Sequence, residues 1–267
     1  MSAITLSLIQ TELVWESPRS NRDILEQKIR SLPKTEVVIL PEMFTTGFSM
    51  DPNRLAEDMQ GPTVQWMKQL AAEKKVILTG SVIIEEGGHY FNRLLWVLPN
   101  GQVGTYDKRH LFAFAGEDQH YTPGQKRFVA SVNGWKVLVL VCYDLRFPVW
   151  SRQHMSFDGD QSPKPEYDLI IYVANWPERR SHAWKTLLQA RAIENQCYVA
   201  AVNRVGSDGK GIGHSGDSMV VDPLGAVLAT AAHEEWVHTI TLERGALDAV
   251  RQQLPFLRDA DRFNIQN

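Results

Sequence analysis

The alternation of apolar and polar positions along the chain predicts many short strands separated by a few helices. The segment "AITLSLIQ" alternates as a half-buried strand does, whereas "VLVLV" and "LIIYV" are continuous apolar runs typical of fully buried strands. Asn100-Gly101 lies between two such segments and predicts the tip of a hairpin. Strands are expected within residues 3–10, 36–44, 76–86, 90–108, 135–144, 168–176, 197–206, 216–230 and 235–242.

Helical spacing of apolar residues separates these strands. Ser17-Pro18 is a typical start signal, and Ile24, Ile29 and Leu32 follow it near helical spacing. Helices are expected at residues 17–32, 62–75, 148–155, 183–196 and 243–254. Because helices alternate with strands that hairpin turns often join, we expect a mixed sheet, or two sheets, with helices packed outside.

The pattern gives no reason to divide the chain. Residues 156–168 indicate a surface loop between a helix and a strand, and residues 255–267 form a tail without a clear period. No Pro/Ser-rich linker or low-complexity run interrupts the rest. We therefore expect a single domain over residues 1–267.

Composition excludes several classes of function. A net charge of −3 gives no general attraction to nucleic acid or to anionic membranes. No stretch approaches the ~18 apolar residues of a membrane span, and the first residues lack the basic start of a signal peptide. Two cysteines cannot build a disulfide framework, which suits a reducing compartment. We expect a cytoplasmic protein that binds neither nucleic acid nor membrane.

Two motifs resemble cofactor and metal sites but lack the necessary context. "GIGHSG" at residues 211–216 matches the dinucleotide fingerprint, yet a strand and a turn follow it where a helix is required. In "HEEWVH", His233 and His238 are five residues apart and the segment alternates as a strand does, whereas a zinc-protease helix needs histidines four apart. We expect no metal and no cofactor.

Polar or reactive side chains follow several of the predicted strands. Glu42 follows "VVILP", Cys142 follows "VLVLV", Asn175-Trp176 ends "LIIYVANW", and Lys108 follows an extended segment. The crevice beyond the carboxyl ends of strands is the usual ligand site of α/β sheets. Together, a carboxylate, a thiol and an ammonium could carry out nucleophilic acyl transfer through a thioester, with proton transfer and oxyanion stabilisation supplied by the two charged groups.

The residues alone also allow interpretations in which these side chains have no catalytic role. A lone cysteine at a strand end is more often a small core residue, and this is the interpretation for Cys197. Glu42 could be a turn cap, and Lys108 in "YDKRH" could be a solvated surface lysine. A redox-sensing thiol would need neither of these charged neighbours. Spacing along the chain does not show that Glu42, Lys108 and Cys142 meet.

Three segments in order resemble the catalytic signatures of the nitrilase superfamily of carbon–nitrogen hydrolases: "LPEMFTTGF", "YDKRHLF" and "VCYDLRFP". "ANWPERRSHAWKTLLQARAIENQCYVAAVNRVG" and "GHSGDSMVVDPLG" also resemble segments of that family, so the similarity spans nearly the whole chain. The resemblance implies a four-layer α-β-β-α sandwich that pairs into homodimers, with the tail at residues 255–267 a candidate for the dimer interface.

The resemblance also implies roles for individual residues. Glu42 would be the general base, Lys108 the stabiliser of the oxyanion and Cys142 the nucleophile. Glu117 matches a further carboxylate of the family, which would either transfer protons or orient Lys108. The backbone N–H of Tyr143 would be the second oxyanion donor.

Within the superfamily, "CYDLRFP" and "NWPERRSHAW" resemble the ω-amidase branch. That branch hydrolyses the terminal amide of 2-oxo-dicarboxylic acid monoamides such as 2-oxoglutaramate and 2-oxosuccinamate. Alternatives are an amidase for deaminated glutathione or small aliphatic amides, a nitrilase, or a catalytically silent binding protein on the same fold.

A substrate of the ω-amidase branch carries a distal carboxylate, which a planar guanidinium binds well. The nearby candidates for this contact are Arg146, Arg179 and Arg180, although Arg146 could instead form a structural ion pair with Asp144 or another acid. Candidates for the apolar walls of the pocket are Phe44, Phe48, Tyr143 and Trp176, which could equally belong to the core.

Overall fold

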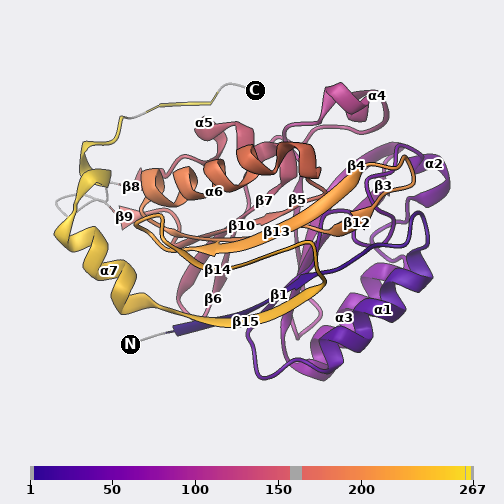
Figure 1. Cartoon of the computed structure of the whole chain (residues 1–267), viewed down its shortest axis with the longest axis horizontal. Helices are drawn as coiled ribbons and strands as arrows, with labels where there is room; N and C mark the ends of the chain where they lie inside the picture. The colour runs from indigo at the N-terminus through magenta and orange to yellow at the C-terminus, as the bar shows by residue number, and fades with distance from the viewer. Residues whose placement is uncertain (1–2, 157–163, 262, 266–267) are drawn as a thin grey trace.

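Two β-sheets lie face to face at the centre of the molecule, with helices on both outer surfaces (Figure 1). The computed structural model describes residues 3–156, 164–261 and 263–265. Its four layers confirm the α-β-β-α sandwich that the sequence predicts.

The first sheet has the strand order β15-β1-β2-β3-β4-β5. Its central strands β1, β2 and β3 are parallel, and the remaining pairs are antiparallel. The strands are β1 (Ala3–Gln10), β2 (Val37–Ile39), β3 (Ile77–Glu86), β4 (His89–Val97), β5 (Val103–Asp107) and β15 (Trp236–Glu243). The predicted hairpin with Asn100-Gly101 at its tip is confirmed as β4 and β5.

The second sheet has the order β12-β13-β11-β10-β7-β6, with β14 paired to β13. Here β7, β10 and β11 run parallel, so their carboxyl ends meet at one edge of the sheet. The strands are β6 (Val129–Val132), β7 (Trp135–Val141), β10 (Leu169–Val173), β11 (Tyr198–Val202), β12 (Val205–Ser207), β13 (Gly213–Val221) and β14 (Val227–Ala232). The short strands β8 (Met155–Ser156) and β9 (Lys164–Pro165) form a separate pair.

Helices cover the outer faces of the two sheets (Figure 1). Helices α1 and α3 pack together over the first sheet, and α6 packs against β11 and β13 of the second. The α-helices are α1 (Pro18–Arg30), α2 (Pro52–Leu55), α3 (Pro62–Lys74), α4 (Glu117–His120), α5 (Pro148–Ser151), α6 (Ser181–Asn195) and α7 (Arg244–Gln253). The 3₁₀ turns are η1 (Ala113–Ala115), η2 (Cys142–Arg146), η3 (Glu178–Arg180) and η4 (Phe256–Asp259).

Side-chain alternation along the strands divides the core into two parts. In β2, Val37 and Ile39 face the second sheet, whereas Val38 faces α1 and α3, where it packs with Leu25 and Ile29. A strand that is covered on both faces in this way needs apolar residues at successive positions, which explains the continuous apolar run.

Two predicted elements are wrong in part. The helix expected at residues 148–155 is the single turn α5, because the backbone becomes extended at Arg152 and the buried Gln153 side chain bonds Tyr167 and Asn195 instead. The strand expected at residues 197–206 breaks after Val202, and its last part joins the neighbouring strand β13.

The loop expected at residues 156–168 lies partly outside the described residues, since residues 157–163 are not described. The tail from residue 255 begins with η4, and its residues 262, 266 and 267 also lie outside the described part. Among the helices of the described residues, none is both long enough and apolar enough to cross a bilayer.

Candidate active site

The structure brings the polar residues at the strand ends into one cluster. Glu42 follows β2 and Lys108 follows β5 in the first sheet, while Cys142 follows β7 and Asn175 comes two residues after β10 in the second. Glu117 begins the short helix α4 between the two halves of the chain. The cluster therefore lies where strand ends of both sheets meet.

Lys108 forms ion pairs with two buried carboxylates. Its Nζ lies 2.9 Å from Glu42 Oε1 and 2.8 Å from Glu117 Oε2, and all three side chains are completely buried. Burial alone would lower the pKa of Lys108, but Glu117 and Glu42 outweigh this effect and raise it, so the ammonium stays charged. Burial raises the pKa of Glu117, and Lys108 only partly opposes this effect.

Cys142 occupies a strained backbone position at the end of β7. Its φ of +45° lies in the left-handed region, which costs a non-glycine residue on the order of 1–3 kcal/mol. Burial and the Glu42 carboxylate raise the pKa of the thiol, while Lys108 opposes them. The resting side chain is therefore a thiol with a base beside it rather than a free thiolate.

Asp144 fixes the turn that carries the nucleophile. Its carboxylate accepts hydrogen bonds from the Val141 N–H at 3.0 Å, the Tyr106 hydroxyl at 2.8 Å and the His110 N–H at 3.0 Å. These donors join the turn to the segment around Lys108. Arg146 makes no ion pair with Asp144, so that interpretation of Arg146 is wrong.

Tyr143, whose backbone N–H is the predicted second oxyanion donor, follows Cys142 directly and lines the cavity. Tyr143 is the second residue of the 3₁₀ turn η2, and the first N–H groups of a helical turn have no acceptor within the turn. Its ring packs edge-on against Phe112 and Phe147.

Two asparagines complete the surroundings of Glu42. Asn175 donates its backbone N–H to Glu42 Oε2 at 2.8 Å and its side-chain amide to the Glu42 carbonyl at 2.5 Å. Asn92 on β4 donates to Glu42 Oε1 at 2.8 Å and to Glu117 Oε1 at 3.1 Å. Sequence reasoning marked the end of β10 but missed Asn92.

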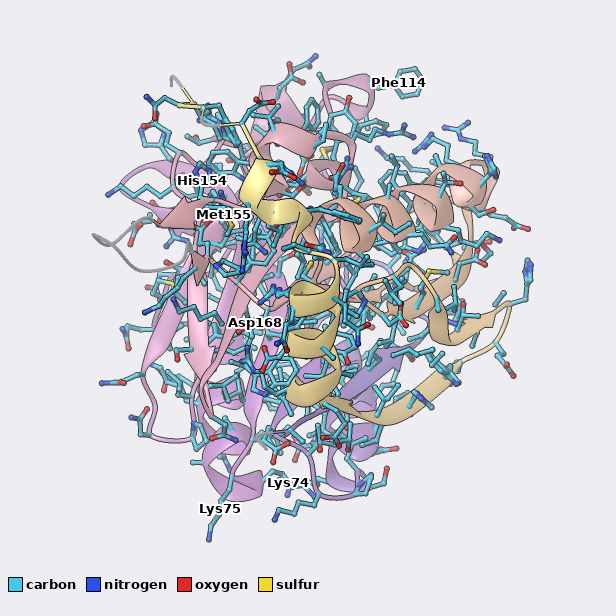
Figure 2. The ribbon with its side chains drawn as sticks, turned by 90° about the vertical axis from the view of Figure 1, so that its left-hand side faces the viewer. Lys74, Lys75, Phe114, His154, Met155 and Asp168 are labelled. Atoms are coloured by element: carbon cyan, nitrogen blue, oxygen red, sulfur yellow. The ribbon has the colours of Figure 1, made fainter. Side chains whose placement is uncertain are left out.

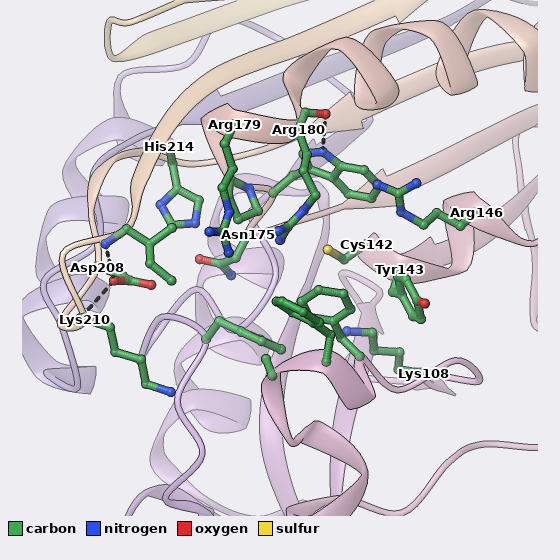
Figure 3. Close-up of a pocket in the computed structure, with 17 residues that line it drawn as sticks. Lys108, Cys142, Tyr143, Arg146, Asn175, Arg179, Arg180, Asp208, Lys210 and His214 are labelled. Atoms are coloured by element: carbon green, nitrogen blue, oxygen red, sulfur yellow. Dashed lines mark hydrogen bonds between the residues drawn. The ribbon is translucent and has the colours of Figure 1, made fainter.

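A cavity of about 250 Å³ opens beside the Cys142 thiol. Figure 3 shows Cys142 and Lys108 at one side of this cavity and Asp208, Lys210 and His214 at the other. The lining residues are mostly aromatic or basic: Phe48, Lys108, Phe112, Phe114, Ala115, Cys142, Tyr143, Arg146, Asn175, Trp176, Pro177, Arg179, Arg180, Asp208, Lys210, Ile212 and His214.

The three predicted arginines line this cavity, and none has a carboxylate within ion-pair distance among the described residues. Arg146 lies over the Trp176 ring and Arg180 over the Phe112 ring, at 4.9 Å and 5.1 Å from the ring centroids. Burial lowers the pKa of Arg180, and so do the neighbouring guanidinium groups of Arg179 and Arg146. Of the cavity-lining residues that the structure describes, Asp208 is the only one with a carboxylate, so the lining carries a net positive charge.

Among the residues predicted to form the apolar walls of the pocket, Phe44 is wrong. Phe48, Tyr143 and Trp176 line the cavity, but Phe44 is completely buried in the core between the first sheet and its helices. Phe44 packs over Gly80, where a side chain would clash with its ring. Because Gly80 has no side chain, it leaves space in the core that the Phe44 ring fills.

The sequence also matches the sequences of known proteins over most of its length. The family model described as carbon-nitrogen hydrolase matches residues 5–252. The chain belongs to the carbon–nitrogen hydrolase family.

Named relatives within the carbon–nitrogen hydrolases are similar over their whole length. The chain is 43% identical to "Omega-amidase YafV" of Escherichia coli K12, covering 99% of the chain and 100% of the relative. It is 33% identical to "2-oxoglutaramate amidase" of Bacillus subtilis, covering 96% of each. The crystal structure of XC1258 from Xanthomonas campestris, a CN-hydrolase with an arsenic adduct in its active site, has a TM-score of 0.96 at 44% identity and full coverage of both chains.

Proposed function

We propose that this carbon–nitrogen hydrolase is an ω-amidase that hydrolyses the terminal amide of 2-oxo-dicarboxylic acid monoamides such as 2-oxoglutaramate and 2-oxosuccinamate. The observation that carries the proposal is a thiol beside a buried Glu42–Lys108–Glu117 cluster, in a cavity lined by three arginines that form no ion pair with a described carboxylate. The relatives named for ω-amidase and 2-oxoglutaramate amidase activity support it.

In the proposed acylation, Glu42 takes the proton of the Cys142 thiol as the sulfur attacks the amide carbonyl carbon. The oxyanion is stabilised by the Lys108 ammonium and the Tyr143 N–H. Glu42 then delivers the proton to the amide nitrogen, the carbon–nitrogen bond breaks, and ammonia leaves. The thiol therefore needs no lowered pKa, because its proton leaves only during attack.

In the proposed deacylation, water attacks the thioester carbonyl while Glu42 again accepts a proton. The same two donors stabilise the second oxyanion, and its collapse returns the proton to the Cys142 sulfur and frees the acid. Glu117 holds the Lys108 ammonium in place through both of its carboxylate oxygens, at 3.0 Å and 2.8 Å. This geometry favours an orienting role for Glu117 over direct proton transfer.

The substrate carboxylate would pair with the guanidinium groups of the cavity. A charge-assisted hydrogen bond contributes about 1.5–3 kcal/mol, so we expect Arg180→Met to lower kcat/KM for 2-oxoglutaramate roughly 10- to 100-fold. Butyramide has no carboxylate, and its kcat/KM should stay within about twofold. Equal losses for both amides would contradict carboxylate recognition by Arg180.

The decisive experiment measures ammonia release from 2-oxoglutaramate, 2-oxosuccinamate, deaminated glutathione, butyramide and butyronitrile. We expect turnover to be fastest for the first two. Preference for deaminated glutathione or butyramide would indicate another amidase branch, preference for the nitrile would indicate a nitrilase, and no turnover of any compound would indicate a silent binding protein.

Variants of the two cysteines distinguish a loss of catalysis from a general effect of replacing a cysteine. Cys142→Ala should lower kcat by at least about 10⁴-fold, whereas Cys197→Ala should keep it, because Cys197 is buried in the core. Glu42→Gln should match the loss in Cys142→Ala. Full activity in Cys142→Ala would exclude the thioester mechanism.

We also propose that the protein is a cytoplasmic, single-domain homodimer, with residues 255–267 at the dimer interface. Light scattering should give twice the 30.3 kDa of one chain, and removal of residues 255–267 should reduce the mass to that of a monomer. A full-length chain that stays at 30.3 kDa would contradict the dimer.

A further inference from the structure

Asn92 is a polar residue on an otherwise apolar strand face. It lies on β4 with Leu94 and Trp96 on the same side, and these two side chains pack between the sheets. Asn92 is completely buried. Burying an amide without hydrogen bonds costs free energy, so its presence here needs a reason.

The side-chain amide of Asn92 bridges the two carboxylates of the cluster. Its Nδ2 lies 2.8 Å from Glu42 Oε1 and 3.1 Å from Glu117 Oε1, so each of its two protons faces one carboxylate. The opposite orientation would point Oδ1 at two negative charges. Oδ1 instead has no hydrogen-bond partner among the described residues, which costs about 1–3 kcal/mol of stability.

The two oxygens of Glu42 have different partners. Oε1 accepts from Asn92 and from the Lys108 ammonium at 2.9 Å, whereas Oε2 accepts from the Asn175 backbone N–H at 2.8 Å. A proton arriving on Oε1 would meet a cation and an amide donor that already use its lone pairs. Oε2 has one lone pair left for the thiol proton.

The cluster contains more negative than positive charge. Glu42 and Glu117 share the single ammonium of Lys108, and the other titratable groups that interact with them are the neutral Cys142 thiol and the Tyr121 hydroxyl. The N–H groups of the Asn92 amide point their positive ends at both carboxylates and so offset part of this excess negative charge.

We propose that Asn92 is a positioning residue that holds the Glu42 carboxylate in place and makes Oε2 the oxygen that exchanges the proton with Cys142. The proposal rests on the thioester mechanism described above for its chemistry, but not on the identity of the substrate. Asn92 is not among the residues that line the cavity, and its contacts with the cluster are to the carboxylates of Glu42 and Glu117.

The test compares pH profiles of Asn92 variants. In Asn92→Leu the carboxylate form of Glu42 loses a donor, so the acid limb of kcat/KM should shift to higher pH, with kcat about 10- to 100-fold lower and KM little changed. Asn92→Asp adds a negative charge and should shift the limb further. Asn92→Ser keeps one donor in a smaller side chain, and its limb should lie between those of the wild type and Asn92→Leu.

A second measurement does not depend on the substrate. Alkylation of Cys142 by iodoacetamide also requires removal of the thiol proton, so its rate should show the same order of pH shifts. If ω-amides are not hydrolysed at all, this alkylation series still tests Asn92 separately from the proposed activity.

The matched control is Asn195, another completely buried asparagine, located in α6 away from the cluster. Asn195→Leu and Asn195→Asp should lower the unfolding temperature and leave both pH profiles in place. Folded Asn92 variants with wild-type pH limbs would overturn the proposal. A pH shift of equal size in the Asn195 variants would also overturn it, since the effect would then reflect stability alone.

Discussion

The burial of the single residue Glu117 in the site lowers the stability of the folded chain. Two carboxylates face one ammonium, and burial raises the pKa of Glu117. Between the ordinary carboxyl pKa and this raised pKa, the folded chain holds a proton that the unfolded chain releases. The stability contributed by this group is therefore present at low pH and is lost as the pH rises through that window.

Glu117→Gln removes this cost. We expect its unfolding temperature to exceed that of the wild type at pH 8 and to approach it as the pH falls toward 4. Activity should fall, because Lys108 loses an anchor. Glu73→Gln, at an exposed carboxylate that ion-pairs with Arg30, should give no such gain. A lower unfolding temperature for Glu117→Gln at pH 8 would show that its ion pair outweighs burial.

Individual residues differ in how far the sequence reveals them. Glu42 and Cys142 stand out because each follows an apolar run, and Lys108 because it follows an extended segment; the structure brings all three together. The signal for Asn92 is weaker: it is the polar exception on a strand face shared with Leu94. The positive φ of Cys142 has no sequence signal, since the surrounding packing imposes it.

At the scale of elements, the segment after α4 crosses β5 at very short distance. Gly124 donates its N–H to the Lys108 carbonyl at 2.9 Å, and a Cβ at this position would lie 2.0 Å from the Asp107 carbonyl oxygen. Backbone cannot move aside as a flexible side chain can. A larger residue here would therefore push the strand end that carries Lys108.

We expect Gly124→Ala to lower stability by about 1–3 kcal/mol and kcat by at least about 10-fold, because Lys108 is displaced. Gly134→Ala is the control, since its Cβ would meet nothing within 4 Å and only its positive φ is strained. Urea unfolding and ammonia release measure the two effects. Wild-type kcat in a destabilised Gly124→Ala would show that Lys108 does not depend on this crossing.

Predictability of the elements follows the strength of local signals. The buried strands were predictable because apolar runs leave few alternatives, and the turn at Asn100-Gly101 has strong hairpin chemistry. The helix expected at residues 148–155 failed because hydrogen bonds of Gln153 to distant residues decide that segment. The prediction that Phe44 lines the pocket is wrong because Gly80, on another strand, leaves space in the core that the Phe44 ring fills.

At the scale of the molecule, Asp168 attaches the C-terminal helix to the second sheet. Its Oδ1 lies 2.7 Å from Arg244 and 2.9 Å from Arg251 at the two ends of α7, and Figure 2 shows Asp168 beside that helix. Burial would raise the pKa of Asp168, but Arg244, the Lys136 N–H and Arg251 outweigh it and lower the pKa. This contribution to stability is present above the ordinary carboxyl pKa and is lost as the pH falls.

We expect Asp168→Asn to lower the free energy of unfolding by about 3 kcal/mol at pH 7, because two guanidinium groups lose their buried partner. The difference from the wild type should shrink as the pH falls below about 4, where the unfolded chain takes up a proton at this carboxyl, and should vanish below the lowered pKa of folded Asp168. Asp248→Asn, on the exposed side of α7, should have little effect. A pH-independent loss in Asp168→Asn would point to packing rather than charge.

The base and the nucleophile come from opposite sheets, and Asn175 of the second sheet bonds Glu42 of the first directly. A slide of one sheet along the other by an ångström would separate thiol from carboxylate while exposing almost no new surface. Turnover is thus a more sensitive gauge of the inter-sheet register than circular dichroism. Warming or hydrostatic pressure should therefore inactivate the enzyme reversibly before the sandwich unfolds.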